Sequence, residues 1–351
     1  MRYNKIMEYK KPLRLKLRDT VGIVSPSWGG PSIFPHIYEN GLKVLKELGL
    51  QIKEYPTARA DNDFLSKNPE ARAKDINDAF ADSEVKAIFA SIGGEDSVRI
   101  LPFLNKEVIQ NNPKILIGYS DTTTLLTYLN QLGLVTFHGP SIMAGFSQAE
   151  SLPESFTQHI QQMLFSPQET YEYSKYSVYC DGYLDWGQEE NLGKTKELKQ
   201  DNGWRFIQGS SVVTGELYGG CIEVLEFMNG TDFWPEKDFW NGKVLFFETS
   251  EEKPSIQQVQ WKLRNYGMQG IFDKVSAVLF GRARDYSDEE KNELDLMIVN
   301  VIKEEFGNAE IPIVTNMDFG HTDPQIILPL GIKAEVDCLS KTFKLIESPL
   351  Q

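Results

Sequence analysis

Cysteine and histidine are scarce in this sequence, and their scarcity narrows the chemistry that it can carry. The chain has three cysteines in 351 residues, and Cys180, Cys221 and Cys338 are far apart and form no C-x-x-C pair. This spacing argues against a disulfide framework and against a structural zinc site. We therefore expect a cytoplasmic location, no bound metal and no organic cofactor. With only four histidines, a reaction that needs an imidazole has few candidates.

Positive charge and long apolar runs are also scarce. Lysine and arginine number 36 against 50 aspartates and glutamates, a formal net charge of −14. Such a surface repels phosphate backbones and anionic lipids, so neither nucleic acid nor a membrane is an expected partner. No apolar run approaches the ~18 residues of a membrane span, which predicts a soluble protein. The first 18 residues are locally basic, through Arg2 and Lys5 among others, but no apolar segment follows, so we expect no signal peptide.

Over residues 21–164, short apolar runs alternate with longer amphipathic stretches. This alternation is typical of βαβ units with a parallel sheet. It predicts strands over 21–25, 85–91, 114–117 and 135–137, and helices over 37–48 and 122–132. Because the loops after parallel strands meet at one edge of a sheet, the loops that hold Trp28, Gly94, Ser120 and His138 should face one crevice.

The middle of the chain breaks this rhythm. Residues 171–210 are polar, charged and aromatic without a clear period, and their aromatic content favours a functional loop over a disordered linker. Strand and helix patterns resume over 212–217, 221–228, 243–247, 255–266, 277–280 and 311–314, and residues 326–345 alternate like short antiparallel strands. The predicted fold class is α/β: an N-terminal parallel-sheet lobe (1–165), an aromatic loop (166–210) and a C-terminal mixed α/β lobe (211–351), with the active site at the interface.

Ser120 lies in a tight turn between an apolar strand and a helix, in the sequence Ile-Gly-Tyr-Ser-Asp-Thr from Ile117. A serine in such a turn exposes its hydroxyl at the sheet edge, and the free N–H groups at the helix start, including that of Asp121, can stabilise an oxyanion. The G-x-S-x-G pattern is only half met, because Thr122 stands at the second glycine position. On this segment alone, helix capping by Ser120 or Asp121 is the simpler explanation.

A catalytic serine needs a base, and the four histidines compete for that role. His36 and His159 lie in polar, helical stretches, where a solvated surface histidine is expected. His138 follows a strand at the sheet edge that should carry the site, so topology allows it. His321 lies in a glycine-containing loop after the strand at 311–314, which suits a catalytic histidine, although turn hydrogen bonding is the commoner role there.

Glu248 is the candidate for a third catalytic member, a carboxylate that orients the imidazole and stabilises its protonated form. It directly follows the apolar run at 243–247, where a charge normally needs a partner, although a strand-end glutamate facing water is also common. The order serine, glutamate, histidine is that of α/β-hydrolases, here with the nucleophile in one lobe and its partners in the other. Lys253, five residues later, could pair with a substrate carboxylate or simply be solvated.

Ordered motifs run along nearly the whole chain. They are Leu-Arg-Asp-Thr-Val-Gly-Ile-Val-Ser-Pro-Ser from Leu17, Ser-Ile-Gly-Gly-Glu-Asp-Ser from Ser91, Ile-Gly-Tyr-Ser-Asp from Ile117, Phe-His-Gly-Pro from Phe137, Gly-Gly-Cys from Gly219, Asn-Gly-Thr from Asn229, Phe-Glu-Thr from Phe247 and Gly-His from Gly320. In this order they resemble the LD-carboxypeptidase serine peptidases, and together they are far more specific than any one motif. Arg18 stands where the family often has glycine, a departure that concerns only that turn.

The resemblance implies roles for five residues. Ser120 would be the nucleophile, Glu248 the orienting carboxylate and His321 the base, with oxyanion N–H groups from Gly94 and Asp121. It also implies a homodimer and a small-molecule peptide or aminoacyl-nucleotide substrate.

The family has two main activities that share this chemistry. One branch removes the terminal D-alanine from murein tetrapeptides, and the microcin C immunity branch hydrolyses the amide-type linkage between an amino acid and a modified adenylate. The aromatic loop resembles the immunity branch, in which a loop tryptophan stacks on adenine. Trp186 matches that tryptophan and Trp204 lies in the same loop, so both are expected to contact substrate; packing of Trp186 against the protein body is the alternative.

These observations predict a Ser-Glu-His hydrolase of aminoacyl adenylates of the immunity and detoxification type. A murein tetrapeptide LD-carboxypeptidase is the first alternative. A non-catalytic, two-lobed small-molecule binding protein is the second, but such a protein would not need all three triad residues.

Overall fold

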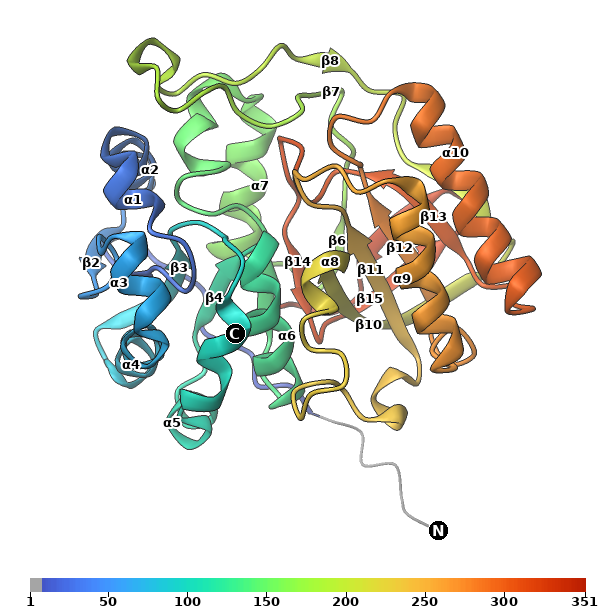
Figure 1. Cartoon of the computed structure of the whole chain (residues 1–351), viewed down its shortest axis with the longest axis horizontal. Helices are drawn as coiled ribbons and strands as arrows, with labels where there is room; N and C mark the ends of the chain where they lie inside the picture. Colours follow the sequence, from blue (N-terminus) through green and yellow to red (C-terminus); the bar gives the residue numbers. More distant parts are fainter. Residues whose placement is uncertain (1–7) are drawn as a thin grey trace.

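The computed structural model describes residues 8–351 and shows two lobes that lie side by side (Figure 1). Arg2 and Lys5, which entered the signal-peptide argument, lie outside the described residues. Among residues 8–351, none of the helices combines the length and the apolar character that crossing a bilayer requires.

The N-terminal lobe is built on a six-stranded sheet in the order β14-β5-β4-β3-β1-β2. Its strands are β1 (Thr20–Val24), β2 (Gln51–Glu54), β3 (Val85–Ala90), β4 (Ile115–Gly118), β5 (Thr136–His138) and β14 (Leu328–Leu330). Strands β1 to β5 are parallel, and β14 is antiparallel to β5. All of β4 is buried, which explains its uninterrupted apolar sequence.

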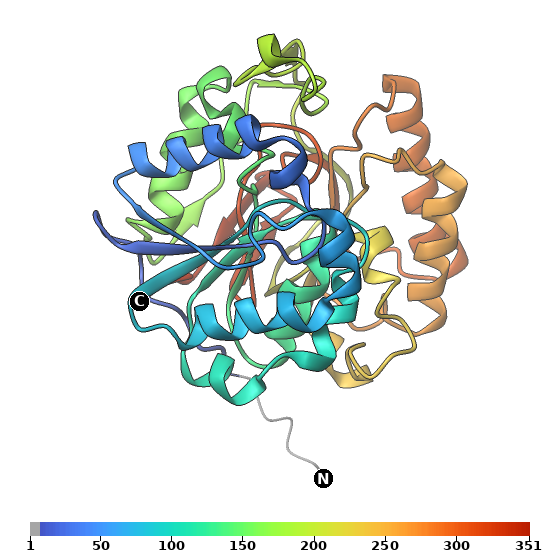
Figure 2. The ribbon, with the colours of Figure 1, turned by 60° about the vertical axis from the view of Figure 1, so that its left-hand side comes forward.

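Helices cover both faces of this sheet. They are α1 (Gly30–Ile33), α2 (Pro35–Glu47), α3 (Asn62–Lys67), α4 (Pro69–Ala81), α5 (Lys106–Asn111), α6 (Thr123–Gln131) and α7 (Glu154–Leu164). Figure 2 shows α2 on one face of the sheet and α4 and α5 on the other. Prolines at the first helical position start α2 and α4, where the missing N–H costs no hydrogen bond.

The C-terminal lobe is built on an eight-stranded sheet in the order β6-β16-β15-β10-β11-β12-β13-β9. Its strands are β6 (Tyr171–Glu172), β9 (Arg205–Gln208), β10 (Val212–Cys221), β11 (Lys243–Glu248), β12 (Ala277–Gly281), β13 (Ile313–Met317), β15 (Lys333–Asp337) and β16 (Thr342–Leu345). Strands β10 to β13 are parallel, and the flanking strands are antiparallel. Its helices are α8 (Ile222–Leu225), α9 (Ile256–Met268) and α10 (Asp288–Val299).

The predicted fold class is confirmed: a parallel-sheet N-terminal part precedes a mixed-sheet C-terminal part. The two parts are interlocked, because β14 comes from late in the chain but pairs with β5 of the first sheet. At the junction, the N–H of Cys221 donates to Thr123 Oγ1 at 3.1 Å. The end of β10 therefore lies against the start of α6, only a few residues after Ser120.

The aromatic segment is more ordered than its sequence suggests. It carries β6, β9 and a small antiparallel pair, β7 (Val178–Tyr179) with β8 (Lys199–Gln200), and it passes over the top of both lobes in Figure 1. Tyr173, Tyr176, Tyr179 and Trp186 are all buried. The segment is therefore a packed strap across the molecule and not a free loop.

Three local predictions need correction. The helix expected over 221–228 is shorter, because α8 ends at Leu225 and turns follow it. β14 leaves the predicted antiparallel tail and joins the first sheet. His159 is not a solvated surface residue: it is buried on the apolar face of α7, bonded to Tyr171 Oη (2.7 Å) and to the N–H of Ile327 (2.8 Å). Burial lowers the pKa of His159 to about 3.

Candidate active site

Ser120 occupies a strained turn between β4 and α6. Its φ is +57°, in the left-handed region that a serine rarely adopts, and it opens a single 3₁₀ turn (Ser120–Thr122) that leads into α6. Gly118 makes the turn possible, because a Cβ at this position would lie 2.9 Å from Thr122 Cγ2 and 3.0 Å from Ala90 Cβ. The N-cap positions of this turn and of α6 are Tyr119 and Thr122, not Ser120 or Asp121, and neither makes a side-chain capping bond. The geometry is that of a nucleophile elbow rather than of a helix cap.

The loop after β3 lies directly against this turn. A Cβ on Gly93 would come within 2.9 Å of Ser120 Oγ and 3.3 Å of the Asp121 nitrogen. Gly94 has φ +150° and leaves no room for a side chain, because its Cβ would lie 2.2 Å from Ser27 Oγ. Gly93 thus brings this loop against the elbow, and Gly94 packs it against the loop after β1. An oxyanion hole requires such a close approach of loop backbone to the nucleophile.

The Asp121 side chain supports this arrangement instead of facing the cleft. It is buried, and Oδ2 accepts the N–H of Ser97 at 2.8 Å. Burial raises the pKa of the Asp121 carboxyl. Its backbone N–H, one residue after Ser120, remains the group of interest for the site.

Glu248 and His321 form a buried pair contributed by the C-terminal lobe. Glu248 is the last residue of β11, His321 lies in the loop after β13, and Glu248 Oε2 accepts a hydrogen bond from His321 Nδ1 at 2.6 Å. Gly320 lets the two backbones approach, since a Cβ there would lie 2.6 Å from Glu248 Cβ. The short distance and the burial are typical of a charge-assisted bond.

This pair favours the ionised form of both partners. Burial alone would lower the pKa of His321, but the charge and hydrogen bond of Glu248, together with Glu251, raise it to about 10. Burial likewise pushes the pKa of Glu248 upward, but the attraction of His321 dominates and lowers it. The pocket thus stabilises an imidazolium beside a carboxylate, which is the charge state that develops when a histidine takes a proton from serine.

Glu251, which the sequence analysis did not single out, lies on the other nitrogen of the imidazole. Its Oε2 is 2.7 Å from His321 Nε2, close but poorly aligned for a hydrogen bond. Nε2 has no hydrogen-bond partner within residues 8–351, Ser120 included. The signal that could have identified Glu251 was its position in the loop just after a parallel strand, where α/β proteins build sites.

His138, the competing candidate base, lies behind Glu248. It is fully buried, its Nε2 is 3.8 Å from Glu248 Oε1, and neither of its ring nitrogens has a hydrogen-bond partner in the described part of the chain. Of the four histidines, His321 alone lines the cleft with Ser120. His36 instead holds the strap in place, through a 2.8 Å contact between its Nε2 and the carbonyl of Trp186.

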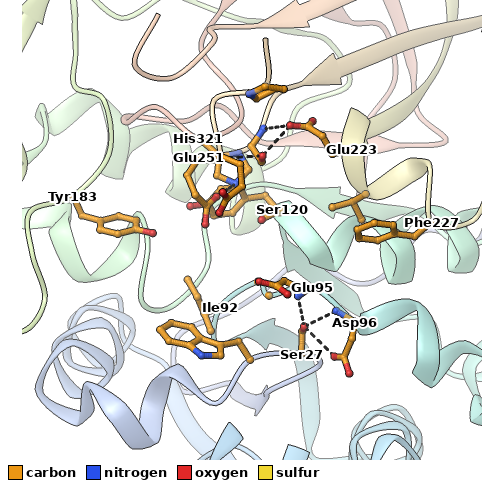
Figure 3. Close-up of a pocket in the computed structure, with 18 of the residues that line it drawn as sticks. Ser27, Ile92, Glu95, Asp96, Ser120, Tyr183, Glu223, Phe227, Glu251 and His321 are labelled. Atoms are coloured by element: carbon orange, nitrogen blue, oxygen red, sulfur yellow. Dashed lines mark hydrogen bonds and ion pairs between the residues drawn. The ribbon is translucent and has the colours of Figure 1, made fainter. Parts of the chain in front are cut away.

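A cleft of about 1270 Å³ opens over these residues, and both lobes and the strap line it. Figure 3 shows Ser120 and His321 at its centre, with Tyr183 to one side and Phe227 to the other. Its charged lining is strongly acidic. One lysine, Lys262, faces six acids: Glu95, Asp96, Asp185, Glu223, Glu251 and Glu252. Within residues 8–351 no cluster of three or more histidine, cysteine, aspartate or glutamate side chains is arranged to hold a metal ion.

One wall of the cleft is aromatic. Tyr183 stacks on Trp186 with ring centroids 4.1 Å apart, and Phe34 meets Trp186 edge-on at 5.7 Å. Trp28 lies 6.1 Å from Phe34, and all four rings line the cleft. Trp186 is only 6% exposed, so it both packs against the protein and borders the cleft.

Two other predicted substrate contacts lie outside this lining. Trp204 donates its Nε1–H to Asp318 at 2.7 Å and packs near Phe343, so it anchors the strap to the C-terminal sheet. Lys253 forms a 3.0 Å ion pair with Glu290. Neither residue is among those that line the cleft.

Comparison with known proteins identifies relatives along almost the whole chain. The N-terminal domain of LD-carboxypeptidases matches residues 21–139, and their C-terminal domain matches residues 214–336. A probable murein peptide carboxypeptidase from Bacillus subtilis is 31% identical, over 95% of this chain and 93% of that protein. The microcin C7 self-immunity protein MccF from Escherichia coli is 28% identical, over 96% of this chain and 95% of that protein.

The fold leads to the same relatives. The solved structure of MccF in complex with aspartyl sulfamoyl adenosine matches with a TM-score of 0.87 and 28% identity, and the match covers 97% of this chain and 100% of that chain. The matches include both lobes, and the curated relatives are carboxypeptidases and a self-immunity protein, so the chain is a hydrolase of the serine peptidase type. It belongs to the LD-carboxypeptidase family, in the branch of the microcin C self-immunity proteins.

Proposed function

We propose that this protein cleaves the amide-type bond between an amino acid and a modified adenylate, and so detoxifies such compounds. The observation that carries the proposal is that Ser120, His321 and the aromatic wall around Trp186 line one cleft. A nucleophile and base beside an aromatic surface suit a substrate with an acyl group at one end and a purine at the other. The likeness to MccF, solved with aspartyl sulfamoyl adenosine, supports this substrate class.

The proposed reaction is acyl transfer through Ser120. His321 Nε2 takes the proton of Ser120 Oγ as that oxygen attacks the scissile carbonyl, and Glu248 stabilises the imidazolium. The imidazolium then gives the proton to the leaving nitrogen, and the amino acid remains as an ester on the serine. Water, deprotonated by His321, attacks this ester, releases the amino acid and restores the serine hydroxyl.

The negative oxygen of each tetrahedral intermediate would rest on the N–H groups of Gly94 and Asp121. The close approach of Gly93, the residue before Gly94, to Ser120 and to the Asp121 nitrogen supports this assignment. Loss of one such donor typically costs ~10²–10³ in rate.

The adenine would bind at the aromatic wall. Because Tyr183 and Trp186 are already stacked, we propose that they act as one platform. Stacking of a base on an aromatic side chain contributes ~1–3 kcal/mol. This suits an acidic cleft, in which Lys262 is the one lysine among the described lining residues and cannot hold a nucleotide by charge alone.

Cleavage of murein tetrapeptides is the second candidate, because the murein peptide carboxypeptidase of Bacillus subtilis is as similar in sequence as MccF. Both candidates use the same triad, so they differ in what the remote part of the cleft binds. The homodimer implied by the family resemblance and the cytoplasmic location inferred from the scarce, unpaired cysteines stay predictions.

The test of the proposal combines labelling with product analysis. A fluorophosphonate probe should label the wild-type protein on Ser120, and mass spectrometry should detect free amino acid released from an aminoacyl sulfamoyl adenosine. The Ser120→Ala variant should show neither reaction. A protein that is labelled but leaves the adenylate intact would disprove the substrate assignment while keeping the serine hydrolase chemistry.

A further inference from the structure

Glu251 and Ser120 compete for a single atom, Nε2 of His321. The other ring nitrogen, Nδ1, is bonded to Glu248, so only Nε2 can accept the Ser120 proton. In the structure Glu251 Oε2 lies 2.7 Å from that nitrogen. While the ring lies protonated between the two carboxylates, His321 cannot act as a base.

Glu251 is also placed to leave this contact. It lies in the loop after β11, its side chain is 41% exposed, and its alignment with Nε2 is poor. Two other acids of the cleft have firm partners: Glu223 Oε1 accepts the Ser250 hydroxyl at 2.8 Å, and Asp96 is held by the buried Arg72 at 2.7 Å. Within residues 8–351 the one ion pair of Glu251 is with His321, and Arg284 is a further charged neighbour, so a cation that enters the cleft can take the place of the histidine.

The proposed substrate supplies such a cation. The α-nitrogen of an aminoacyl group is roughly 2.5 Å from the carbonyl carbon, two bonds away. In a reactive complex that carbon lies ~3–3.5 Å from Ser120 Oγ, and Oγ lies in hydrogen-bond reach of Nε2. The α-ammonium therefore lies within roughly 9 Å of Nε2 at most, a range that includes the position of Glu251.

We propose that Glu251 is a carboxylate latch that binds the α-ammonium of the substrate and, by this exchange, frees His321 Nε2 for Ser120. The inference rests on the proposed function, because it requires an aminoacyl substrate with a free amine. In the exchange the imidazolium loses its proton to solvent and becomes the neutral base, while Glu251 keeps its charge and gains the ammonium as partner. Binding should therefore release a proton.

The other charged groups around the imidazole do not prevent Glu251 from exchanging His321 for the α-ammonium. The titratable and charged groups near His321, besides Glu251, are Glu248, His138, Asp323, Tyr119, Tyr183 and Arg284. Burial raises the pKa of Asp323 to about 6 and that of Tyr119 well above its usual value. The attraction of His321 outweighs burial and lowers the pKa of Glu251 to about 2, so the latch is a carboxylate at every working pH.

The first test is kinetic and uses paired substrates, an aminoacyl sulfamoyl adenosine with a free α-amine and its N-acetylated form. Wild type should prefer the free amine by about tenfold or more, as expected for a hydrogen bond to a charged group. Glu251→Gln should raise KM for the free amine about tenfold and abolish the preference. Glu252→Gln, which removes the same charge from the same cleft but does not contact His321, should keep the preference. An unchanged preference in Glu251→Gln overturns the proposal.

The second test measures the proton itself. Calorimetric titration of Ser120→Ala with the free-amine compound, in buffers of different ionisation enthalpy at pH 7, where the α-amine is already mostly an ammonium, should show release of about one proton per bound ligand. The additional Glu251→Gln substitution should reduce this release at least twofold. Tight binding without proton release overturns the latch but not the proposed function.

A third measurement distinguishes a failure of the proposed function from a failure of the latch. If the compound does not bind at all, the proposed function fails, and the latch is still tested by NMR titration of His321 in the free protein. Glu251→Gln should then lower the pKa of His321 relative to wild type, whereas Glu252→Gln should leave it in place. An equal His321 pKa in all three proteins refutes the latch.

Discussion

Replacing Glu248 by glutamine tests the catalytic pair while nearly preserving its shape. The side chain is fully buried and 2.6 Å from His321 Nδ1, so the amide can still occupy the site. What it removes is the charge that stabilises the imidazolium. With charge centres ~4 Å apart and an effective dielectric constant of ~20, the lost interaction is about 4 kcal/mol. At ~1.4 kcal/mol per factor of ten, kcat should fall about 10³-fold.

The same substitution should also change the pH dependence of kcat/KM, in a way that a general loss of activity would not. The active form needs neutral His321, so kcat/KM rises with pH through the His321 pKa. That pKa is raised to about 10 in the wild type, with Glu248 as its strongest charged partner. Glu248→Gln should therefore shift the rising limb to lower pH even as the maximum falls.

The assay is the pH dependence of p-nitrophenyl acetate hydrolysis, because this ester has no titrating amine. Thermal unfolding of both proteins controls for the loss of a buried charge. The assignment of Glu248 as the orienting carboxylate would be refuted if Glu248→Gln is folded, loses less than tenfold in rate, and shows the same rise of kcat/KM with pH as the wild type.

Three further substitutions test the remaining roles. Ser120→Ala should reduce turnover by ~10⁴–10⁶ with binding retained. Near-normal hydrolysis by this variant would show that Ser120 is not the nucleophile. His321→Ala should reduce turnover as much as Ser120→Ala, whereas His138→Ala should mainly affect folding. A severe loss of turnover in His138→Ala alone would show that His138, and not His321, is the base. Trp186→Ala should raise KM for aminoacyl adenylates by about tenfold or more while sparing p-nitrophenyl acetate, and Trp186→Phe should restore most of the loss, because stacking contributes ~1–3 kcal/mol. Equal losses of Trp186→Ala on both substrates would make the ring purely structural.

The sequence predicted the elements around the site because their signals are local. Buried parallel strands such as β4 and β11 read as unbroken apolar runs, and the residues just after them must lie at one sheet edge. Ser120 and Glu248 could therefore be placed without the structure. The choice of His321 over His138 could not, because topology allows both, and only the family resemblance separated them.

The sequence-based predictions are wrong where contacts between distant parts of the chain determine the structure. His159 has the spacing of the apolar stripe of α7, with Phe156 and Met163, but the strand segment that covers it comes from the other end of the chain. Strands β6 to β8 have two residues each, too few to show a period, so the strap looked like a loop. Lys253 looked available for substrate because its partner, Glu290, belongs to a distant helix.

The roles of two cleft residues are visible only in three dimensions. Glu251 reads in sequence as an exposed glutamate in a charged turn, and its contact with His321 joins positions 70 residues apart. Tyr183 reads as one of many strap aromatics, and its stacking on Trp186 depends on how the strap folds back over α2. Side-chain partners of this kind are set by the tertiary fold and carry no periodic signal.

The most direct test of the central claim compares two substrates on the wild-type protein. Purified enzyme is given an aminoacyl sulfamoyl adenosine and a murein tetrapeptide under identical conditions, and kcat/KM is measured for each. If the cleft binds an acyl group at Ser120 and a purine at the aromatic wall, the adenylate should be preferred by about tenfold or more. Robust release of D-alanine from the tetrapeptide with no cleavage of the adenylate would contradict the account and assign the protein to murein recycling.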